Sequence, residues 1–373
     1  MRSVQLYLHI PFCVRKCAYC DFLSFPLSQS LLEEYTDALL QEIYSYKEEG
    51  RAWRVPSVFI GGGTPSLLGH HQLQRLMQAL FEVFAIEGDA EITLEANPGT
   101  IHEGVAQGYR DAGINRLSLG LQSVHARELQ LLGRIHTYDE FLVSYERARS
   151  AGFTNINIDL MYAIPEQTCQ SWEETLREVL RLEPEHISAY SLIVEAGTPF
   201  YGQKLALPGE EEEERMYEMV KPLLLQNGYD QYEISNFARN GLACRHNKGY
   251  WTRQEYIGLG LGAASLYDAR RFSNTPDLKE YLHKSAQPVQ MRTAIENLSI
   301  EEEMAEQMIL GLRMTAGVDT KEFAARFRKT PQEVYGDIIS KHEQTGLLQN
   351  QNERVVLTER GLRLSNYVMS DFI

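Results

Sequence analysis

The sequence has no long apolar run and few basic residues. No stretch approaches the ~20 apolar residues that cross a bilayer, and the first ten residues lack the basic and apolar regions of a secretory signal peptide. Lys and Arg number 36 against 51 Asp and Glu, a net charge of −15. This balance opposes non-specific binding to nucleic acid and to anionic membranes. We therefore expect a soluble cytoplasmic protein with no nucleic-acid partner, and nothing indicates peripheral membrane contact.

Cysteine is also scarce, with five residues in a chain of 373. An odd number of cysteines in a chain this long does not describe a disulfide framework. Hydrophobic residues make up 43% and charged residues 23%, values close to the globular average that argue against disorder. A chain of this length is sufficient for a large barrel with an additional small domain.

Three of the five cysteines lie close together, as Cys13-x3-Cys17-x2-Cys20. Clustered thiolates in a reducing compartment usually hold a metal, because the metal offsets their mutual repulsion. A buried helix face would explain the spacing without a metal, but Pro11 and the charged neighbours disfavour it. Two metal sites remain open: zinc with His9 as fourth ligand, or a [4Fe–4S] cluster with one iron free to bind a small molecule.

Apolar, β-branched runs alternate with amphipathic helical patterns through the first half of the chain. This alternation predicts a parallel sheet covered by helices. Six units in about 190 residues indicate part of a barrel, since eight strands need ~250 residues. The predicted strands are 4–10, 57–60, 91–95, 116–121, 155–161 and 186–192, and the predicted helices between them are 31–48, 72–84, 101–112, 138–151 and 171–182.

Polar or glycine-rich residues follow every predicted strand, where the sites of such folds are built. Each one alone has an ordinary explanation as a helix cap, ion-pair partner or tight turn. Together they predict a site of carboxylates, amides and free backbone N–H groups, suited to a cationic ligand with an amino-acid moiety and hydroxyls. The residues are the cysteine loop, Gly61-Gly62-Gly63-Thr64-Pro65, Glu95-Ala-Asn97-Pro98, Gln122-Ser123, Asp159 and Ile193-Val-Glu195.

The cysteine motif, with an aromatic residue beside its last cysteine, resembles that of radical SAM proteins. In that family S-adenosylmethionine (SAM) binds the fourth iron, and an electron from the cluster cleaves SAM to give a 5′-deoxyadenosyl radical. Further segments are similar to the oxygen-independent coproporphyrinogen oxidases and their HemW-type heme-chaperone relatives. These segments are Tyr7-Leu-His-Ile-Pro-Phe-Cys13, Gly61–Ser66, Gly120-Leu-Gln122-Ser123, Leu132-Gly-Arg134 and Asn157-Ile-Asp159-Leu-Met-Tyr162.

The resemblance implies a six-stranded partial (β/α)6 barrel of the TIM type and a specific set of ligand contacts. The cluster ligands would be Cys13, Cys17 and Cys20. The resemblance also implies contacts of SAM with Ile193 and with a backbone position near Leu261. The main SAM contacts would be Tyr7, Tyr19, Gly62, Gly63, Thr64, Glu95, Gln122, Arg134 and Asp159.

The second half predicts two further segments, so that the expected domains are 1–200 (barrel), 201–298 (barrel extension) and 299–373. A helix is predicted from Glu210 to about Gln226, and residues 232–237 alternate as a strand. The last segment predicts three helices and a hairpin, an α+β arrangement that resembles a winged helix. Residues 301–373 carry nine basic and twelve acidic residues, so this domain lacks the basic face that DNA binding needs. We expect a lid or docking domain.

His246-Asn-x-x-Tyr250-Trp251 is the second segment of interest. A histidine among aromatics is often a hydrogen-bonded structural residue. As a neutral imidazole it could instead be an axial ligand of heme iron, with Cys244 as a less favoured thiolate alternative. The run resembles the motif that marks HemW-type proteins, and this resemblance implies heme as a third cofactor with His246 as its candidate ligand.

Two departures from the oxidases favour the chaperone. The oxidases carry a further cysteine where this chain has Phe22, and they have an N-terminal arm for which Cys13 leaves no room. We therefore predict a heme chaperone with a [4Fe–4S] cluster and SAM that delivers heme to unidentified acceptor hemoproteins, with no catalytic residue assigned. The alternatives are a radical SAM decarboxylase acting on porphyrinogen propionates and a zinc-stabilised scaffold.

Overall fold

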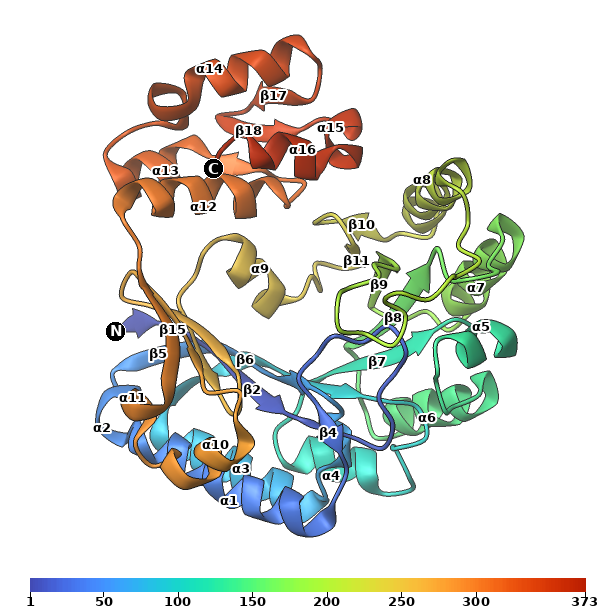
Figure 1. Ribbon diagram of the computed structural model, residues 1–373, viewed down its shortest axis with the longest axis vertical. Helices are drawn as coiled ribbons and strands as arrows, with labels where there is room; N and C mark the ends of the chain where they lie inside the picture. Colours follow the sequence, from blue (N-terminus) through green and yellow to red (C-terminus); the bar gives the residue numbers. More distant parts are fainter.

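The computed structural model describes residues Met1–Ile373, and one large open sheet forms its centre (Figure 1). Six neighbouring strands of this sheet are parallel and follow the chain order. This arrangement confirms the predicted partial barrel. The six strands are β2 (Gln5–Ile10), β5 (Trp53–Gly62), β6 (Ala85–Ala96), β7 (Arg116–Gln122), β8 (Ile156–Tyr162) and β9 (His186–Ser191).

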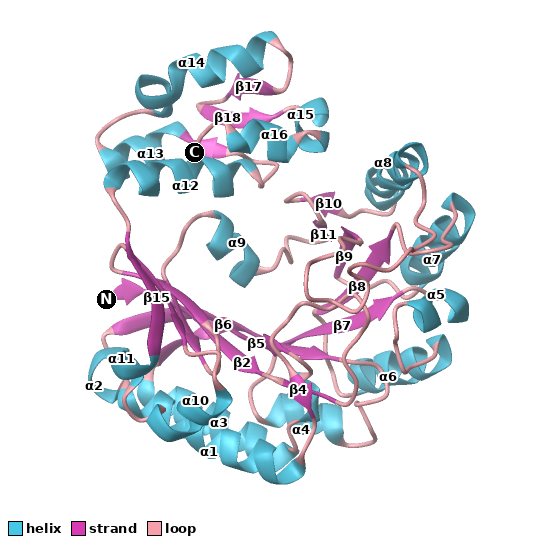
Figure 2. Ribbon diagram, in the orientation of Figure 1, coloured by secondary structure: helices cyan, strands magenta, loops and turns pink.

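The parallel strands are apolar runs because both of their faces are covered. All seven residues of β7 are buried, as expected for a central parallel strand. The covering helices lie along the outer side of the sheet in Figure 2, and α6 begins with a capping box between Thr137 and Glu140. These helices are α1 (Gln29–Ser45), α2 (Lys47–Gly50), α3 (His70–Val83), α4 (Val105–Asp111), α5 (Ala126–Leu131), α6 (Tyr138–Ser150), α7 (Cys169–Arg181) and α8 (Glu210–Gln226).

Short strands from residues 230–297 extend both ends of the parallel sheet. β12 (Tyr256–Leu259) lies parallel to β2, and β13 (Ala264–Tyr267), β14 (Arg270–Asn274) and β15 (Arg292–Asn297) follow it in antiparallel order. These strands share one sheet with the barrel strands. The predicted domain boundaries within this sheet stay a prediction.

The single strand predicted at 232–237 is wrong. β10 (Asp230–Gln231) and β11 (Asn236–Ala238) form an antiparallel hairpin here. The chain turns because the buried Glu233 carboxylate accepts hydrogen bonds from the Ser235 backbone N–H and the Asn236 side chain. The alternating pattern therefore does not continue as one strand, because Glu233 closes the turn of a hairpin.

The C-terminal residues form a small domain with its own core of 15 buried residues between Met304 and Phe372. Its first helix begins with the predicted capping box of Ser299 and Glu302. Three helices precede a hairpin, as predicted, and a three-stranded sheet joins them. The elements are α12 (Ile300–Leu312), β16 (Val318–Asp319), α13 (Thr320–Phe327), α14 (Pro331–Gln344), β17 (Leu348–Gln351), β18 (Arg354–Leu357), α15 (Glu359–Arg363) and α16 (Ser365–Ser370).

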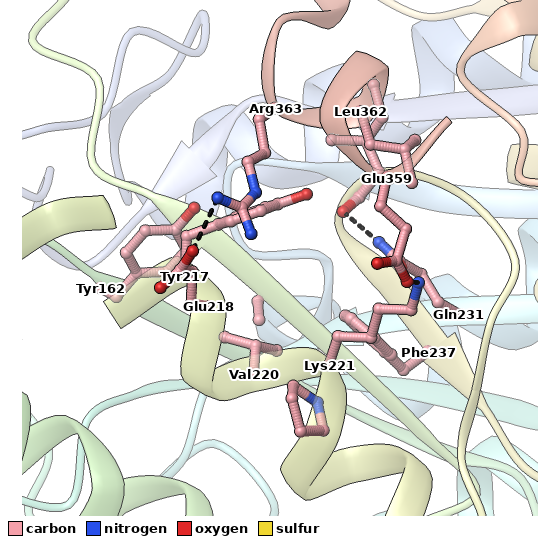
Figure 3. A pocket seen from close by; sticks show the side chains of 13 residues that line it. Tyr162, Tyr217, Glu218, Val220, Lys221, Gln231, Phe237, Glu359, Leu362 and Arg363 are labelled. Carbon is pink, nitrogen blue, oxygen red and sulfur yellow. Dashed lines mark hydrogen bonds and ion pairs between the residues drawn. The ribbon is translucent and has the colours of Figure 1, made fainter. Parts of the chain in front are cut away.

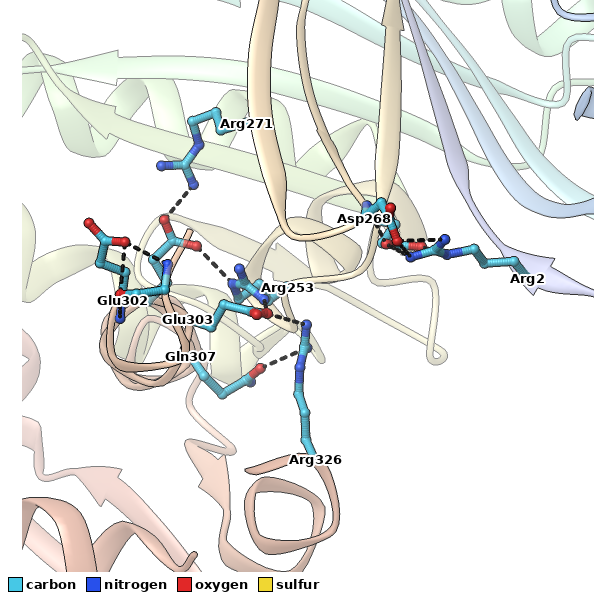
Figure 4. A network of polar contacts seen from close by, with 11 residues as sticks. Arg2, Arg253, Asp268, Arg271, Glu302, Glu303, Gln307 and Arg326 are labelled. Atoms are coloured by element: carbon cyan, nitrogen blue, oxygen red, sulfur yellow. Dashed lines mark hydrogen bonds and ion pairs between the residues drawn. The ribbon is translucent and has the colours of Figure 1, made fainter. Parts of the chain in front are cut away.

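The C-terminal domain contacts the barrel at α9 (Arg245–Trp251) through a network of ion pairs (Figure 4). Arg253, just after α9, pairs with Glu303 at 2.6 Å and with Glu306 at 2.7 Å, both on α12. Arg271 also pairs with Glu306 and Arg326 with Glu303. The Arg253 side chain is 1% exposed, so this network is largely removed from water.

A second contact joins α8 to α15 of the C-terminal domain and borders a cavity of about 640 Å³ (Figure 3). Lys221 pairs with Glu359 at 2.8 Å, and Arg363 pairs with Glu218 at 2.6 Å. The cations that line this cavity therefore already have carboxylate partners. No helix anywhere in the structure is both long and apolar enough to pass through a bilayer.

Candidate cluster and cofactor site

The three motif cysteines open into one cavity of about 690 Å³, here called the cluster cavity. They lie in the loop after β2, and the other walls come from the ends of the parallel strands that follow. The structure therefore brings together residues that are far apart in sequence, as predicted for the carboxyl edge of a parallel sheet. Eight of the nine predicted SAM contacts line the same cavity: Tyr19, Gly62, Gly63, Thr64, Glu95, Gln122, Arg134 and Asp159.

The glycine run after β5 packs tightly against the cysteine loop. A Cβ on Gly62, whose φ is +112°, would lie 2.6 Å from the His9 ring, and a Cβ on Gly63 would lie 2.7 Å from the Phe12 carbonyl oxygen. The Gly62 N–H donates to Glu95 at 3.1 Å and the Gly63 N–H to the Ile10 carbonyl at 2.9 Å. The prediction of free backbone N–H groups is therefore wrong at these two residues, because the protein itself supplies their acceptors.

Two of the three cysteine sulfurs face polar donors. Thr64 Oγ1 lies 3.5 Å from Cys13 Sγ, and Arg134 Nη1 lies 3.5 Å from Cys17 Sγ. Asn97 ties these donors together, since it donates to Thr64 Oγ1 at 2.9 Å and accepts from Arg134 Nη2 at 2.7 Å. Hydrogen bonds of this kind stabilise thiolates and the clusters that they hold. Asn97 was among the residues predicted to form the site after the strands, but it was not one of the SAM contacts that the resemblance implied.

The cysteine loop fits an iron–sulfur cluster better than a single zinc ion. Burial, together with the nearby Cys17 and Cys13 sulfurs, raises the pKa of Cys20, so three thiolates here require a positive partner. No three His, Cys, Asp or Glu side chains converge closely enough to hold one metal ion. His9, the fourth ligand of the zinc alternative, uses both ring nitrogens for hydrogen bonds with Tyr7 Oη and the Leu23 carbonyl.

Two buried carboxyl groups, Glu95 and Asp159, line the cluster cavity. Burial, and then the charge of Asp159, raises the pKa of Glu95 to about 8. Burial also raises the pKa of Asp159, although hydrogen bonds from Asn157 and Ser118 act in the opposite direction. A positively charged ligand beside these groups would stabilise their ionised forms. The sulfonium of SAM is a ligand of this kind.

Tyr7, the ninth predicted contact, lies in a neighbouring cavity of about 720 Å³, here called the inner cavity. The two cavities share Phe22, Gly62, Glu95, Ser118 and Asp159, so they adjoin. Neither Ile193 nor Leu261 lines either cavity; Ile193 is exposed and Leu261 is fully buried. Residues of the inner cavity that the sequence did not single out are Phe59, Arg116, Ser188 and Tyr190, whereas Asn157 and Asn247 belong to the motifs quoted above.

His246 lies on α9 and is 1% exposed. Its Nδ1 lies 3.0 Å from Ser57 Oγ and its Nε2 lies 3.0 Å from Tyr250 Oη, while its ring stacks on Phe59. Burial and the charge of Arg116 lower its pKa to about 3. The ring is therefore neutral at physiological pH, with both nitrogens hydrogen bonded inside the protein.

Cys244, the alternative heme ligand, is fully buried. Its Sγ donates to Glu91 at 3.3 Å, and burial raises its pKa to about 12. The residue is therefore a neutral thiol, and the structure gives no support to its role as a thiolate ligand. Glu91 also accepts from the backbone N–H groups of Arg245 and His246, so it holds the first turn of α9 against β6.

Comparisons with known proteins agree with this geometry. Residues 7–179 match the radical SAM superfamily, and residues 298–364 match the HemN C-terminal domain. The structure of Escherichia coli coproporphyrinogen III oxidase (HemN), described as a radical SAM enzyme, superposes with a TM-score of 0.88 at 26% identity, covering 100% of this chain and 90% of that one.

Relatives that match over nearly the whole chain narrow the family assignment. Heme chaperone HemW of Lactococcus lactis is 37% identical over 371 residues, which cover 98% of this chain and 96% of the relative. Heme chaperone HemW of Bacillus subtilis is 37% identical over 372 residues, covering 98% of each chain. The chain therefore belongs to the HemW heme-chaperone family of the radical SAM superfamily.

Proposed function

We propose that this protein binds heme together with a [4Fe–4S] cluster and SAM, and that it transfers heme to acceptor hemoproteins. One observation carries the proposal: the cluster cavity adjoins a second cavity that reaches Asn247 of the motif helix α9. The proposed cofactor site of radical SAM type would thus lie next to a space bounded by the segment that resembles the HemW motif. The name heme chaperone, which the relatives from Lactococcus lactis and Bacillus subtilis carry, supports the same conclusion.

The three cysteines would hold the cluster, and the residues around them have distinct roles. When bound, the cluster offers one iron to SAM and can supply an electron to it. Thr64 and Arg134 donate hydrogen bonds to Cys13 and Cys17, which fixes the orientation of these sulfurs. Glu95 and Asp159 line the cavity, and a sulfonium ligand beside them would stabilise their ionised, negatively charged forms. Phe22, which is 58% exposed, lies at the border of both cavities.

His246 is the proposed axial ligand of heme. Its low pKa keeps the imidazole neutral, which is the form that binds iron. Ligation requires that Nε2 leave Tyr250 Oη, and the ring must move from its buried position against Phe59. Heme binding is therefore expected to be coupled to a local opening of α9.

Anaerobic heme titration of variants tests this role. His246→Ala should lose the histidine-ligated heme spectrum, whereas Tyr250→Phe should bind heme faster because it frees Nε2. His342→Ala is a matched control, since this buried histidine of the C-terminal domain pairs with Asp371. Unchanged heme spectrum and affinity in His246→Ala would remove this residue from the heme site.

The oxidase remains a second candidate because the fold matches that of HemN closely. Phe22 takes the position of the additional cysteine expected in the oxidases. Anaerobic incubation with coproporphyrinogen III, SAM and a reductant separates the two functions. We expect no protoporphyrinogen, and its formation at a catalytic rate would replace the chaperone by the decarboxylase.

A further inference from the structure

Arg116, the first residue of β7, is a buried arginine without a partner. The residue is 2% exposed. Its guanidinium forms no hydrogen bond or ion pair with another side chain, and its buried Nε has no acceptor. Arg134, by comparison, donates to Asn97, and Arg149 pairs with Glu185 at 2.8 Å. Because an unpaired buried charge costs several kcal/mol, this arrangement requires an explanation.

The two carboxyl groups that act on the charge of Arg116, those of Glu91 and Asp159, already accept hydrogen bonds from other groups. Glu91 accepts from Cys244 and from two backbone N–H groups of α9. Asp159 accepts from Ser118 and Asn157. Neither forms an ion pair with Arg116. Burial lowers the pKa of Arg116, but the acidic groups around it, Glu91 and Asp159 among them, raise it overall, so the side chain stays charged.

Arg116 lines the inner cavity. A partner for its guanidinium would therefore be a ligand bound in this cavity. Asn247 lines it too, and its side chain makes no hydrogen bond within the protein although it borders the buried α9 histidine. The aromatic rings of Tyr7 and Phe59, which stack on each other, form an apolar wall of the cavity. The cavity thus combines one free cation, one free amide and an apolar face with the Glu95 and Asp159 carboxyl groups that it shares with the cluster cavity.

We propose that Arg116 is a carboxylate receptor of the inner cavity, with Asn247 as a second donor, and that it binds a propionate of the porphyrin. The guanidinium fork matches a carboxylate with two parallel hydrogen bonds, and the apolar wall suits the edge of a macrocycle. This inference rests on the proposed function, since heme is the ligand that carries the propionates. A free amino-acid carboxylate, such as that of SAM, is the other source of the same chemistry.

The test compares two ligands on three proteins. Anaerobically prepared wild type and Arg116→Gln, each with its iron content measured, are titrated with heme and with heme dimethyl ester, whose propionates are esterified. The wild type should bind heme about tenfold or more tighter than the ester, the size expected for losing a charge-assisted pair. Arg116→Gln should bind both ligands with similar, weakened affinity. Arg149→Gln, outside both cavities, should keep the preference for heme.

Thermal melting separates this role from a structural one. Arg116→Gln should melt at or above the wild-type temperature, since the substitution removes an uncompensated buried charge. A large decrease in melting temperature with unchanged heme affinity would overturn the proposal. If the variant does not fold, equal affinity of the wild type for heme and for the ester also overturns it.

Two further outcomes distinguish the sources of the carboxylate and the two proposals. Weakened SAM binding with unchanged heme binding in Arg116→Gln assigns the receptor to an amino-acid carboxylate and overturns the propionate. Absence of heme binding in the wild type contradicts the proposed function itself. Heme binding by the wild type with no effect of Arg116→Gln contradicts only the receptor.

Discussion

Replacing Arg253 by Gln should loosen the C-terminal domain from the barrel. Arg253 pairs with Glu303 and Glu306, whose side chains are 14% and 17% exposed. Removing one partner of a buried ion pair typically costs about 3–5 kcal/mol. Arg326 and Arg271 still pair with the two glutamates at 3.4 Å and 2.7 Å, so we expect a smaller loss in the free energy of unfolding, about 2 kcal/mol.

Urea unfolding followed by tryptophan fluorescence measures this loss. Trp53 and Trp172 are buried in the barrel, whereas Trp251 lies at the interface, where Arg313 stacks on it at 4.4 Å. The interface signal should therefore change at lower urea than the barrel signal in the variant. Because the C-terminal domain has its own core, its helical circular dichroism signal should persist after the interface opens.

A matched control is Arg177→Gln, which breaks a pair with Glu173 whose side chains are 57% and 41% exposed. This substitution should change stability by less than about 0.5 kcal/mol. If Arg253→Gln unfolds in one transition with wild-type stability, the ion pairs do not hold the domain in place, and the reasoning from burial is refuted.

Three further predictions concern other parts of the molecule. Cys17→Ser should lose iron and sulfide after anaerobic purification, whereas Cys169→Ser, outside the cavity, should retain them; equal iron in both would contradict the cluster assignment. Burial raises the pKa of Glu42 from 4.5 to about 7, so the folded protein holds a proton that the unfolded chain has lost, and stability falls as pH rises between these values. Glu42→Gln should remove up to about 1.4 kcal/mol of this decline per pH unit in urea unfolding, and an unchanged slope would refute the assignment. Thr137→Ala removes the capping box of α6 and should cost about 1 kcal/mol; no loss in the same assay would show that the cap is not needed.

The parallel part of the fold could be predicted because its signals are local. Strands such as β7 are buried on both faces and therefore appear as continuous apolar runs. β15 gave no such signal, because five of its six residues are exposed and it is held by pairing with β14. The turn at Glu233 was missed because alternation describes strand faces and does not show which carboxylate closes a hairpin.

The cluster cavity could be predicted to a similar extent. Its cysteines are close in sequence, and its other residues follow strands, so the topology alone brings them together. The surroundings of His246 could not be predicted, since Ser57 comes from a strand far away in the chain. Arg116 stood at the start of a predicted strand, where sequence does not distinguish a solvated arginine from a buried one without a partner.

The short helix α9 is held at its two ends by two different bodies. Glu91 of the barrel binds the N–H groups of its first turn, and α12 of the C-terminal domain binds Arg253 directly after its last turn. A shift of one body relative to the other must break one of these attachments or carry the helix along. The position of His246 and Asn247 therefore depends on the relative placement of the two domains, and a protein that docks on the C-terminal domain would thereby displace the proposed heme-binding segment.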